Sequence, residues 1–413
     1  MKTATTPSLR RYTEKEVVAL ALPLRQRLGI SRLTSVGEFI NLPGVSIVNA
    51  VRTEIKKGQI SSTQGKGRSL IAATCSALME AYERHCACWC EPAIFHHQAT
   101  TDDKQTLQRL GFAPECDIQQ WIKGYEWHTG RERRIPAIEV QFPYHGADRH
   151  HANIQAHTSG LACGGSLEEA TCFAIMESIE RNTTSLFYKH CLSKICADFV
   201  DLSTISRAST MTLWEHLNDK GYESFALRIH GPLPTYYVAL YDPVSMGPKF
   251  MIAGSASGFT ESDALDAAMM EAIQGLVVSL QASREDLHRQ EKKYRSQSLF
   301  ETSKFSKLRA LFQQHYANVA MPSSELSPLE QSSLEQSSLE QSSSEQSSSE
   351  QSSSEQSPET LTAATQFLAK ALEKQGVEDV YMVDLSLSDL PFHTVKAVIP
   401  GLYDWHVNPG RVG

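Results

Sequence analysis

Ser76-Ala-Leu-Met-Glu80-Ala-Tyr-Glu83-Arg84 has two related stretches further along this chain, Ala174-Ile-Met-Glu177-Ser-Ile-Glu180-Arg181 and Ala268-Met-Met-Glu271-Ala-Ile-Gln274. Each continues an apolar run rich in Ala and Met that predicts a helix, where residues three positions apart share one face. A single Glu-x-x-Glu pair is commonly a solvated surface feature, and its repulsion destabilises a helix by roughly 0.2–0.5 kcal/mol. Three copies on core-facing helices require a cation or a donor. The array therefore predicts a cage for Mg²⁺ ions that accompany a nucleotide triphosphate.

Composition favours an enzyme of ordinary size that stays in the cytoplasm. The chain has 413 residues, a net charge of -8 and nine cysteines, an odd number that fits reduced thiols better than a disulfide framework. Its Lys and Arg residues are scattered, which excludes a nucleic-acid surface, and no apolar run is long enough to cross a membrane. The N-terminal residues lack the apolar core of a signal peptide. Cys86, Cys88 and Cys90 lack the spacing of a zinc knuckle.

The pattern along the chain predicts an α/β or α+β domain built from pseudo-repeats. A helix-prone stretch from Glu14 to Leu28 precedes a strand-like stretch from Glu38 to Arg52. The glycines around Lys66, just ahead of the first motif helix, predict a turn whose N–H groups approach an anion. Further strands are expected in β-branched and aromatic runs, and Gly-rich turns at 158–165 and 254–258. Those strands are Arg134 to Pro143, Thr235 to Tyr241, Phe250 to Gly254, Val380 to Leu385 and Val395 to Ile399.

One segment is too polar to join a core. From Leu329 to Pro358 the chain repeats a five-residue unit of Ser, Glu and Gln, and such a segment cannot bury enough surface to offset its ordering entropy. We expect a disordered insertion, followed by a helix from Leu361 to Gln375 that Gly376 ends. The predicted organisation is an N-terminal extension (1–35), a core (36–322), the insertion (323–358) and a C-terminal part of the core (359–413).

The motifs, in their order, resemble those of the YcaO family. They are Gly65-Lys-Gly67, Ser76-x-x-x-Glu80-x-x-Glu83-Arg84, Gly160-Leu-Ala-x-Gly164, Glu177-x-x-Glu180-Arg181, Glu271-x-x-Gln274 and Val398-Ile-Pro-Gly-Leu402. The resemblance implies a YcaO-like fold around a nucleotide site. It also implies ATP-dependent phosphorylation of a peptide amide oxygen, after which a side-chain nucleophile gives an azoline or external sulfide gives a thioamide.

By matching motif positions, the resemblance also implies roles for eleven residues. Five would bind Mg²⁺: Glu80, Glu83, Glu177, Glu180 and Glu271. Lys66 and Ser69 would contact phosphate, and Ser76 belongs to the same cofactor-binding set. Arg84, Arg181 and Gln274 would orient the carboxylates or the phosphates. These roles suit phosphoryl transfer, which depends on positioning and charge neutralisation.

The chain departs from the family pattern at several positions. Asn182 stands where Asp is usual, Thr158-Ser159 where Ser-Asn is typical, and Tyr403 where Glu is frequent. The last residues lack the proline alternation typical of azoline-forming members, which favours thioamide formation. The resemblance also implies a separate leader-binding (E1-like) or TfuA-type partner for a peptide or protein substrate, and leaves a homodimer open. The alternative function is a non-catalytic accessory or scaffold protein that assists another modification enzyme.

Overall fold

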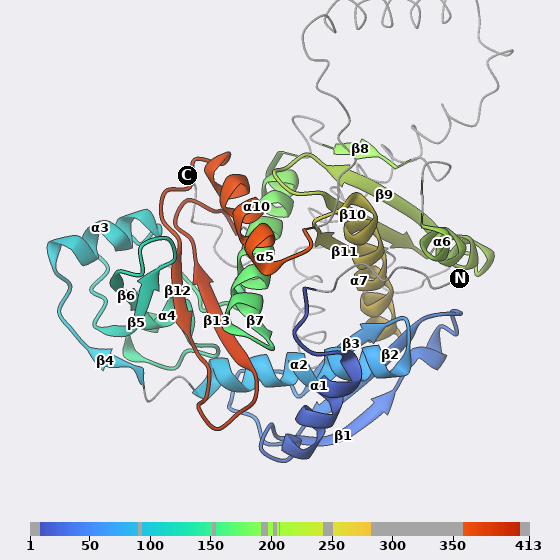
Figure 1. The fold of residues 1–413 in the computed structure, drawn as a ribbon, viewed down its shortest axis with the longest axis horizontal. Helices are drawn as coiled ribbons and strands as arrows, with labels where there is room; N and C mark the ends of the chain where they lie inside the picture. The colour runs from blue at the N-terminus through green and yellow to red at the C-terminus, as the bar shows by residue number, and fades with distance from the viewer. Residues whose placement is uncertain are drawn as a thin grey trace, which may run out of the picture. The chain divides into compact units, whose positions relative to one another are not determined.

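The computed structural model describes residues 9–89, 93–150, 154–190, 197–200, 205, 207–242, 251–281 and 358–404 (Figure 1). Within these ranges the helices are α1 (Glu14–Ala21), α2 (Leu70–Trp89), α3 (Thr101–Arg109), α4 (Ala137–Val140), α5 (Leu167–His190), α6 (Ala208–Asp219), α7 (Glu261–Gln281) and α10 (Leu361–Glu373). Short 3₁₀ turns are η1 (Leu22–Leu24), η2 (Gly37–Phe39) and η4 (Ala147–His150). No helix among the described residues is long and apolar enough to cross a membrane.

The strands of the described residues form three antiparallel sheets. The first has the order β1 (Ile30–Ser35), β2 (Ser46–Arg52), β3 (Ser62–Gly67). The second has the order β11 (Met251–Ser257), β10 (Thr235–Tyr241), β9 (Glu223–Ile229), β8 (Ala197–Phe199). The third has the order β4 (Phe95–His96), β5 (Gln120–Glu126), β12 (Tyr381–Asp384), β13 (His393–Val398), β7 (Leu161–Gly164), with β6 (Glu132–Pro136) paired to β5. The predicted mixture of helices and sheets is confirmed.

The three motif helices each pack on the strand that precedes them in sequence. α2 packs on β3, α5 on β7 and α7 on β11, and each helix contributes to a separate apolar core. Each also contacts the next unit, since α2 meets β7, α5 meets β11 and α7 meets β3. The three strand–helix units therefore close into a ring (Figure 1). Their Glu-bearing faces can meet at its centre.

Gly65 and Gly254 allow this close packing, and both lie in strands where the sequence predicted turns. Gly65 and Lys66 lie within β3, not in an anion-binding turn. A Cβ on Gly65 would lie 2.1 Å from the backbone of α2, and a Cβ on Gly254 in β11 would lie 2.3 Å from that of α7. Only glycine lets strand and helix approach so closely. The stretch at 158–165 does contain a turn, at Ser159 and Gly160, where Gly160 has a φ of 76°, but its second half is strand β7, and Gly254 belongs to β11.

Of the other elements predicted from the sequence, some are confirmed and some are confirmed only in part. The strand at 235–241 is confirmed, as is the helix that ends ahead of Gly376, whose φ of 70° suits glycine. The stretch from Glu38 to Arg52 is strand only in its second half, because it begins with η2 and a turn. The run from Arg134 to Pro143 leaves the sheet after Pro136 and becomes α4.

The C-terminal strands lie inside the third sheet. β12 pairs with β5 and β13 with β7, so the chain returns after residue 358 to bridge strands from its first half (Figure 1). α10 packs against α5 on this side. The Ser/Glu/Gln repeat lies outside the described residues.

Candidate functional site

All eleven residues that the sequence predicts for the site line one cavity of about 910 Å³. They come from β3, from the N-terminus of α2 and from the facing sides of α2, α5 and α7. The ring of three repeats explains this convergence, because each helix turns its i,i+3 pair towards the same centre. The members are Lys66, Ser69, Ser76, Glu80, Glu83, Arg84, Glu177, Glu180, Arg181, Glu271 and Gln274.

The arginines of the first two motifs hold the first glutamate of their own helix. The Arg84 guanidinium lies 2.9 Å from the carboxylate of Glu80, and that of Arg181 lies 3.4 Å from Glu177. Both are i,i+4 pairs, the spacing that favours contact on a helix. The third motif has Gly275 at this place, and Gln274 stands where the other two carry their second glutamate. Its glutamate, Glu271, forms an ion pair with Lys66 of β3.

Two further contacts connect one repeat to the next. Glu180 accepts hydrogen bonds from the Ser255 hydroxyl (3.2 Å) and the Ser257 backbone N–H (3.1 Å), both on β11. Gln274 donates to the Gln64 carbonyl oxygen on β3 at 3.0 Å, rather than to a carboxylate. Side chains of α5 and α7 thus bind the strand of a neighbouring repeat, and this fixes the width of the cavity.

Burial makes the glutamates resist ionisation. It raises the pKa of Glu177 to about 7, although Arg181 opposes the shift. Burial also raises the pKa of Glu83 well above its usual range, reinforced by Glu80, and raises that of Glu180 despite Arg181 and the two bonds from β11. Desolvation penalises charge, and neighbouring carboxylates add repulsion. The site therefore holds more acidic groups than its own cations neutralise.

Lys66 is affected in the opposite direction. Burial lowers its pKa to about 8, while Glu180 and Glu80 act to raise it. Its ammonium group lies in the cavity between strand β3 and Glu271 of α7. A lysine on a strand that lines the cavity can exchange its carboxylate partner for an anionic ligand.

The two predicted serines occupy different parts of the cavity wall. The hydroxyl of Ser69 accepts the backbone N–H of Ala72 at 3.1 Å and so caps the beginning of α2. Ser76 lies one turn before Glu80 on the same helix and lines the cavity. Ser69 therefore has a structural role at the helix N-terminus, in addition to its position in the cavity.

The donor set suits Mg²⁺, although no ion site is already assembled. Among the described residues, no three Asp, Glu, His or Cys side chains converge as a metal-binding group. Carboxylate oxygens are the donors that Mg²⁺ prefers, and it usually binds through one or two of them together with phosphate and water. Glutamates with raised pKa on two helices, with Lys66, Arg84 and Arg181 between them, fit a metal that arrives with a phosphate ligand.

The N-terminal segment contributes to the wall in a way that the sequence did not indicate. Arg10 and Tyr12 line the cavity. Arg10 pairs with the buried Glu169 at 2.9 Å and lies 3.7 Å above the ring of Phe173. Glu169 also accepts the backbone N–H of Arg11 at 3.0 Å. These contacts join segments far apart in the chain, and no local pattern signals them.

Comparisons with known proteins agree with this geometry. Residues 64–403 match the family described as YcaO cyclodehydratase, ATP- and Mg²⁺-binding. An uncharacterized protein of Methanothermobacter thermautotrophicus is 24% identical over 393 residues, covering 94% of this chain and 93% of the relative. An uncharacterized protein of Mycobacterium tuberculosis is 26% identical over 287 residues, covering 67% of this chain and 64% of the relative.

Three solved structures share the fold. YcaO from Methanopyrus kandleri, bound with AMPPCP and Mg²⁺, has a TM-score of 0.67 at 18% identity and covers 98% of this chain and 95% of its own. A heterocyclase in complex with substrate and cofactor has a TM-score of 0.67 at 14% identity, over 98% of this chain and 54% of its own. The E. coli microcin synthetase McbBCD complex with pro-MccB17 bound has a TM-score of 0.56 at 12% identity, and the match covers 89% of this chain and 87% of its own.

The fold and the cavity define a class of proteins with three strand–helix units around a carboxylate-rich site. Since the family match covers most of the sequence, the chain belongs to the YcaO family. The resemblance stated from the sequence motifs is confirmed.

Proposed function

We propose that the protein uses Mg·ATP to activate a backbone amide of a peptide or protein for modification. The observation that carries the proposal is the convergence of five glutamates and three cations, from three repeats, on one cavity of about 910 Å³. The family description, which names cyclodehydratase activity, ATP and Mg²⁺, supports the same function. When bound, Mg·ATP supplies the phosphoryl group that turns the amide oxygen into a leaving group.

The residues of the chain would divide this work by charge. Glu80 and Glu83 on α2, together with Glu177 and Glu180 on α5, would hold Mg²⁺. Lys66, Arg84 and Arg181 would bind phosphate oxygens and neutralise their charge. Such positioning and charge stabilisation supply most of the catalysis in phosphoryl transfer. Glu271 would join the metal site once Lys66 turns from it to the phosphates.

Calorimetric titration tests the nucleotide site. We expect the protein to bind ATP in the presence of Mg²⁺ and to lose that binding in excess chelator, because clustered carboxylates repel a triphosphate unless metal ions bridge them. AMP is the matched control, since it carries the same base and sugar with less phosphate charge. Equal ATP affinity with and without Mg²⁺ would contradict the carboxylate site.

Within this function we propose thioamide formation ahead of azoline formation, on a peptide delivered by a separate partner protein. Tyr403, which stands where glutamate is frequent in the family, favours this choice. Mass spectrometry of a peptide incubated with the protein, Mg·ATP and sulfide separates the two products. A thioamide exchanges oxygen for sulfur, whereas an azoline loses one water. A product without sulfur would overturn the preference for thioamide formation and leave the activation step intact.

The accessory role is the second candidate, and the observation in its favour is the pairing of Lys66, Arg84 and Arg181 with carboxylates across the site. A scaffold protein with internally neutralised charge would bind no nucleotide. The calorimetric titration decides between the two functions. Cytoplasmic location stays a prediction of the sequence.

A further inference from the structure

A second, much smaller cavity lies behind Arg181. It has a volume of about 30 Å³, and its polar lining residues are Glu139, His157, Ser159, Ser178, Arg181 and Asp404, beside apolar residues at 397–399 and Leu402. Arg181 also lines the large cavity, so its side chain is shared by both. A change on one side of this guanidinium group can therefore alter its position on the other.

Two residues that line the small cavity, Arg181 and Asp404, each carry a buried polar atom without a hydrogen-bond partner in the described part of the chain. Among the described residues, no hydrogen bond reaches Nε of Arg181 or Oδ1 of Asp404, although both atoms are buried. Asp404 is only 6% exposed. A buried donor or acceptor without a partner is costly, and natural proteins satisfy nearly all of them, often with ordered water. An unsatisfied donor and an unsatisfied acceptor around one cavity imply a shared ligand.

The size of the cavity identifies that ligand as water. A water molecule needs a cavity of roughly 10–15 Å³, so this one holds about two. Its lining mixes apolar residues with polar groups, which include two serine hydroxyls, an imidazole and two carboxylates besides the guanidinium. A metal ion beside the arginine would face a fixed positive charge.

The surroundings of Asp404 are rigid. Its other carboxylate oxygen accepts the Ser159 hydroxyl. The fully buried Lys396 on β13 donates to the carbonyl oxygens of His157 (3.0 Å) and Ser159 (2.7 Å). The backbone N–H of Tyr403 donates to Asn182 of α5 at 2.8 Å. The C-terminal segment is thus fixed to both the loop before β7 and the helix that carries Arg181.

We propose that Asp404 is a positioning residue of the nucleotide site, acting on Nε of Arg181 through water in the small cavity. This bridge holds the guanidinium so that its Nη2 atom faces Glu177 and the large cavity. The inference rests on the proposed function, because the site that Asp404 serves is the nucleotide site. It adds to that function a residue that lies outside the large cavity.

The test measures Mg·ATP affinity by calorimetry in the full-length protein. We expect Asp404→Ala to weaken binding about tenfold, as loss of a residue that orients a ligand-binding group commonly does. Asp404→Asn keeps an acceptor oxygen, so it should recover much of the loss. Arg181→Lys keeps the positive charge but removes Nε–H, and in that background Asp404→Ala should have no further effect.

Asp103 provides a matched control. It is buried to a similar extent, but it belongs to α3, binds Arg134 and lines neither cavity. Asp103→Asn should lower the melting temperature and leave Mg·ATP affinity of the folded protein within about twofold. Equal weakening by Asp103→Asn and Asp404→Ala would overturn the inference, because the loss would reflect general destabilisation.

Two other results would also overturn it. One is unchanged affinity in Asp404→Ala while the parent protein binds Mg·ATP, which leaves the proposed function standing. The other is a crystal structure, at a resolution that shows waters, in which the small cavity is dry. A parent protein that binds no Mg·ATP would remove both the proposed function and the positioning role.

Discussion

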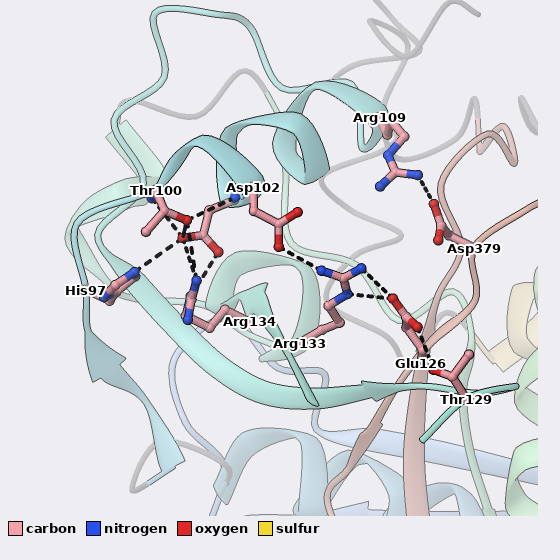
Figure 2. A network of polar contacts seen from close by, with 10 residues as sticks. His97, Thr100, Asp102, Arg109, Glu126, Thr129, Arg133, Arg134 and Asp379 are labelled. Carbon is pink, nitrogen blue, oxygen red and sulfur yellow. Dashed lines mark hydrogen bonds and ion pairs between the residues drawn. The ribbon is translucent and has the colours of Figure 1, made fainter. Parts of the chain in front are cut away.

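Two groups of charged residues in this molecule both combine carboxylates with basic side chains, but they differ in how completely the carboxylates are paired. Figure 2 shows the first, at α3 and the adjoining strands, where Arg133 bridges Asp102 (2.7 Å) and Glu126 (2.6 Å). In the same network Arg134 binds both carboxylate oxygens of the buried Asp103, at 2.9 and 3.1 Å. The second group is the ring of glutamates in the large cavity. In one region carboxylates are fully paired, and in the other they outnumber their cations.

The pKa values of the two regions shift in opposite directions. For Asp103 the largest single effect, desolvation, raises the pKa, but hydrogen bonds from Arg134 and Thr100 outweigh it and the net pKa is lowered. The Thr129 hydroxyl lowers the pKa of Glu126, against a small opposing effect of burial and with help from Arg133. In the cavity, burial raises the pKa of Glu83, Glu177 and Glu180.

The difference separates a structural role from a functional one. A lowered pKa means that the folded protein favours the ionised carboxylate, so ionisation contributes to stability. A raised pKa means that folding places the carboxylate where its ionised form is less stable, mainly through burial and partly through neighbouring carboxylates, a cost that protonation or a further cation removes. The comparison therefore predicts that mutations in the cavity reduce function with little loss of stability, and that mutations in the paired network reduce stability with little loss of function.

The largest effect is expected at the cavity. Glu80→Gln or Glu177→Gln should reduce ATP turnover about a hundredfold or more, because a ligand of the metal–phosphate unit is lost. Stability without ligand should change little or rise, since the substitution relieves repulsion among like charges. Melting temperatures with and without Mg·ATP provide the second measurement. If nucleotide still stabilises both variants as it does the parent, the glutamates do not bind the metal.

The opposite outcome is expected in the network of Figure 2. Asp103 accepts from Arg134 and His97 and completes the N-terminal capping box of α3 with Thr100. Asp103→Asn should cost about 2 kcal/mol in the free energy of unfolding, because it removes the carboxylate charge that pairs with Arg134 and weakens the side-chain acceptor of the capping box. Mg·ATP affinity should stay unchanged. Urea denaturation measures the free energy of unfolding and calorimetry measures the Mg·ATP affinity. A loss of affinity without loss of stability would contradict a structural role for Asp103.

Acidic pH should reduce the difference in unfolding free energy between the parent protein and Asp103→Asn. Because folding lowers the pKa of Asp103, its stabilising effect is present above its ordinary value of 3.8 and is lost as the pH falls through the lowered folded value. The unfolding free energies of the parent and of Asp103→Asn should therefore converge at acidic pH. Urea denaturation at a series of pH values checks this. A gap that stays constant into acid would show that the carboxylate charge does not contribute.

The sequence predicted the cavity better than its surroundings. The i,i+3 glutamates and their i+4 arginines are local features of single helices, so their positions follow from helical periodicity. Three related helices also implied a common centre, and the structure brings all eleven predicted residues to one cavity. Gly65 was wrongly assigned to a turn, because the close approach of β3 to α2 depends on both elements at once.

The residues behind the site could not be found in this way. Lys396, Asp404 and Glu169 each act on segments more than a hundred residues away in the chain, and a single buried charge has no periodic pattern. Asn182 and Ser159 were noted only as departures from the family pattern. In the structure both bind the C-terminal segment at 403–404, so these two departures lie together beside Arg181.

The smallest effect is expected from the Ser/Glu/Gln repeat, which resembles neither region. From Leu329 to Pro358 it has no Lys or Arg, and its only apolar side chains before Pro358 are Leu329, Leu334 and Leu339, too few to form a core. We predict that joining Pro328 directly to Pro358 leaves the melting temperature within a few degrees and Mg·ATP binding unchanged, because loop length alters closure entropy only slowly. Calorimetry and thermal denaturation of the shortened protein measure both. A large loss of either would show that the repeat packs on the domain or binds its ligand, and that unpaired acidic groups in this chain are not confined to the cavity.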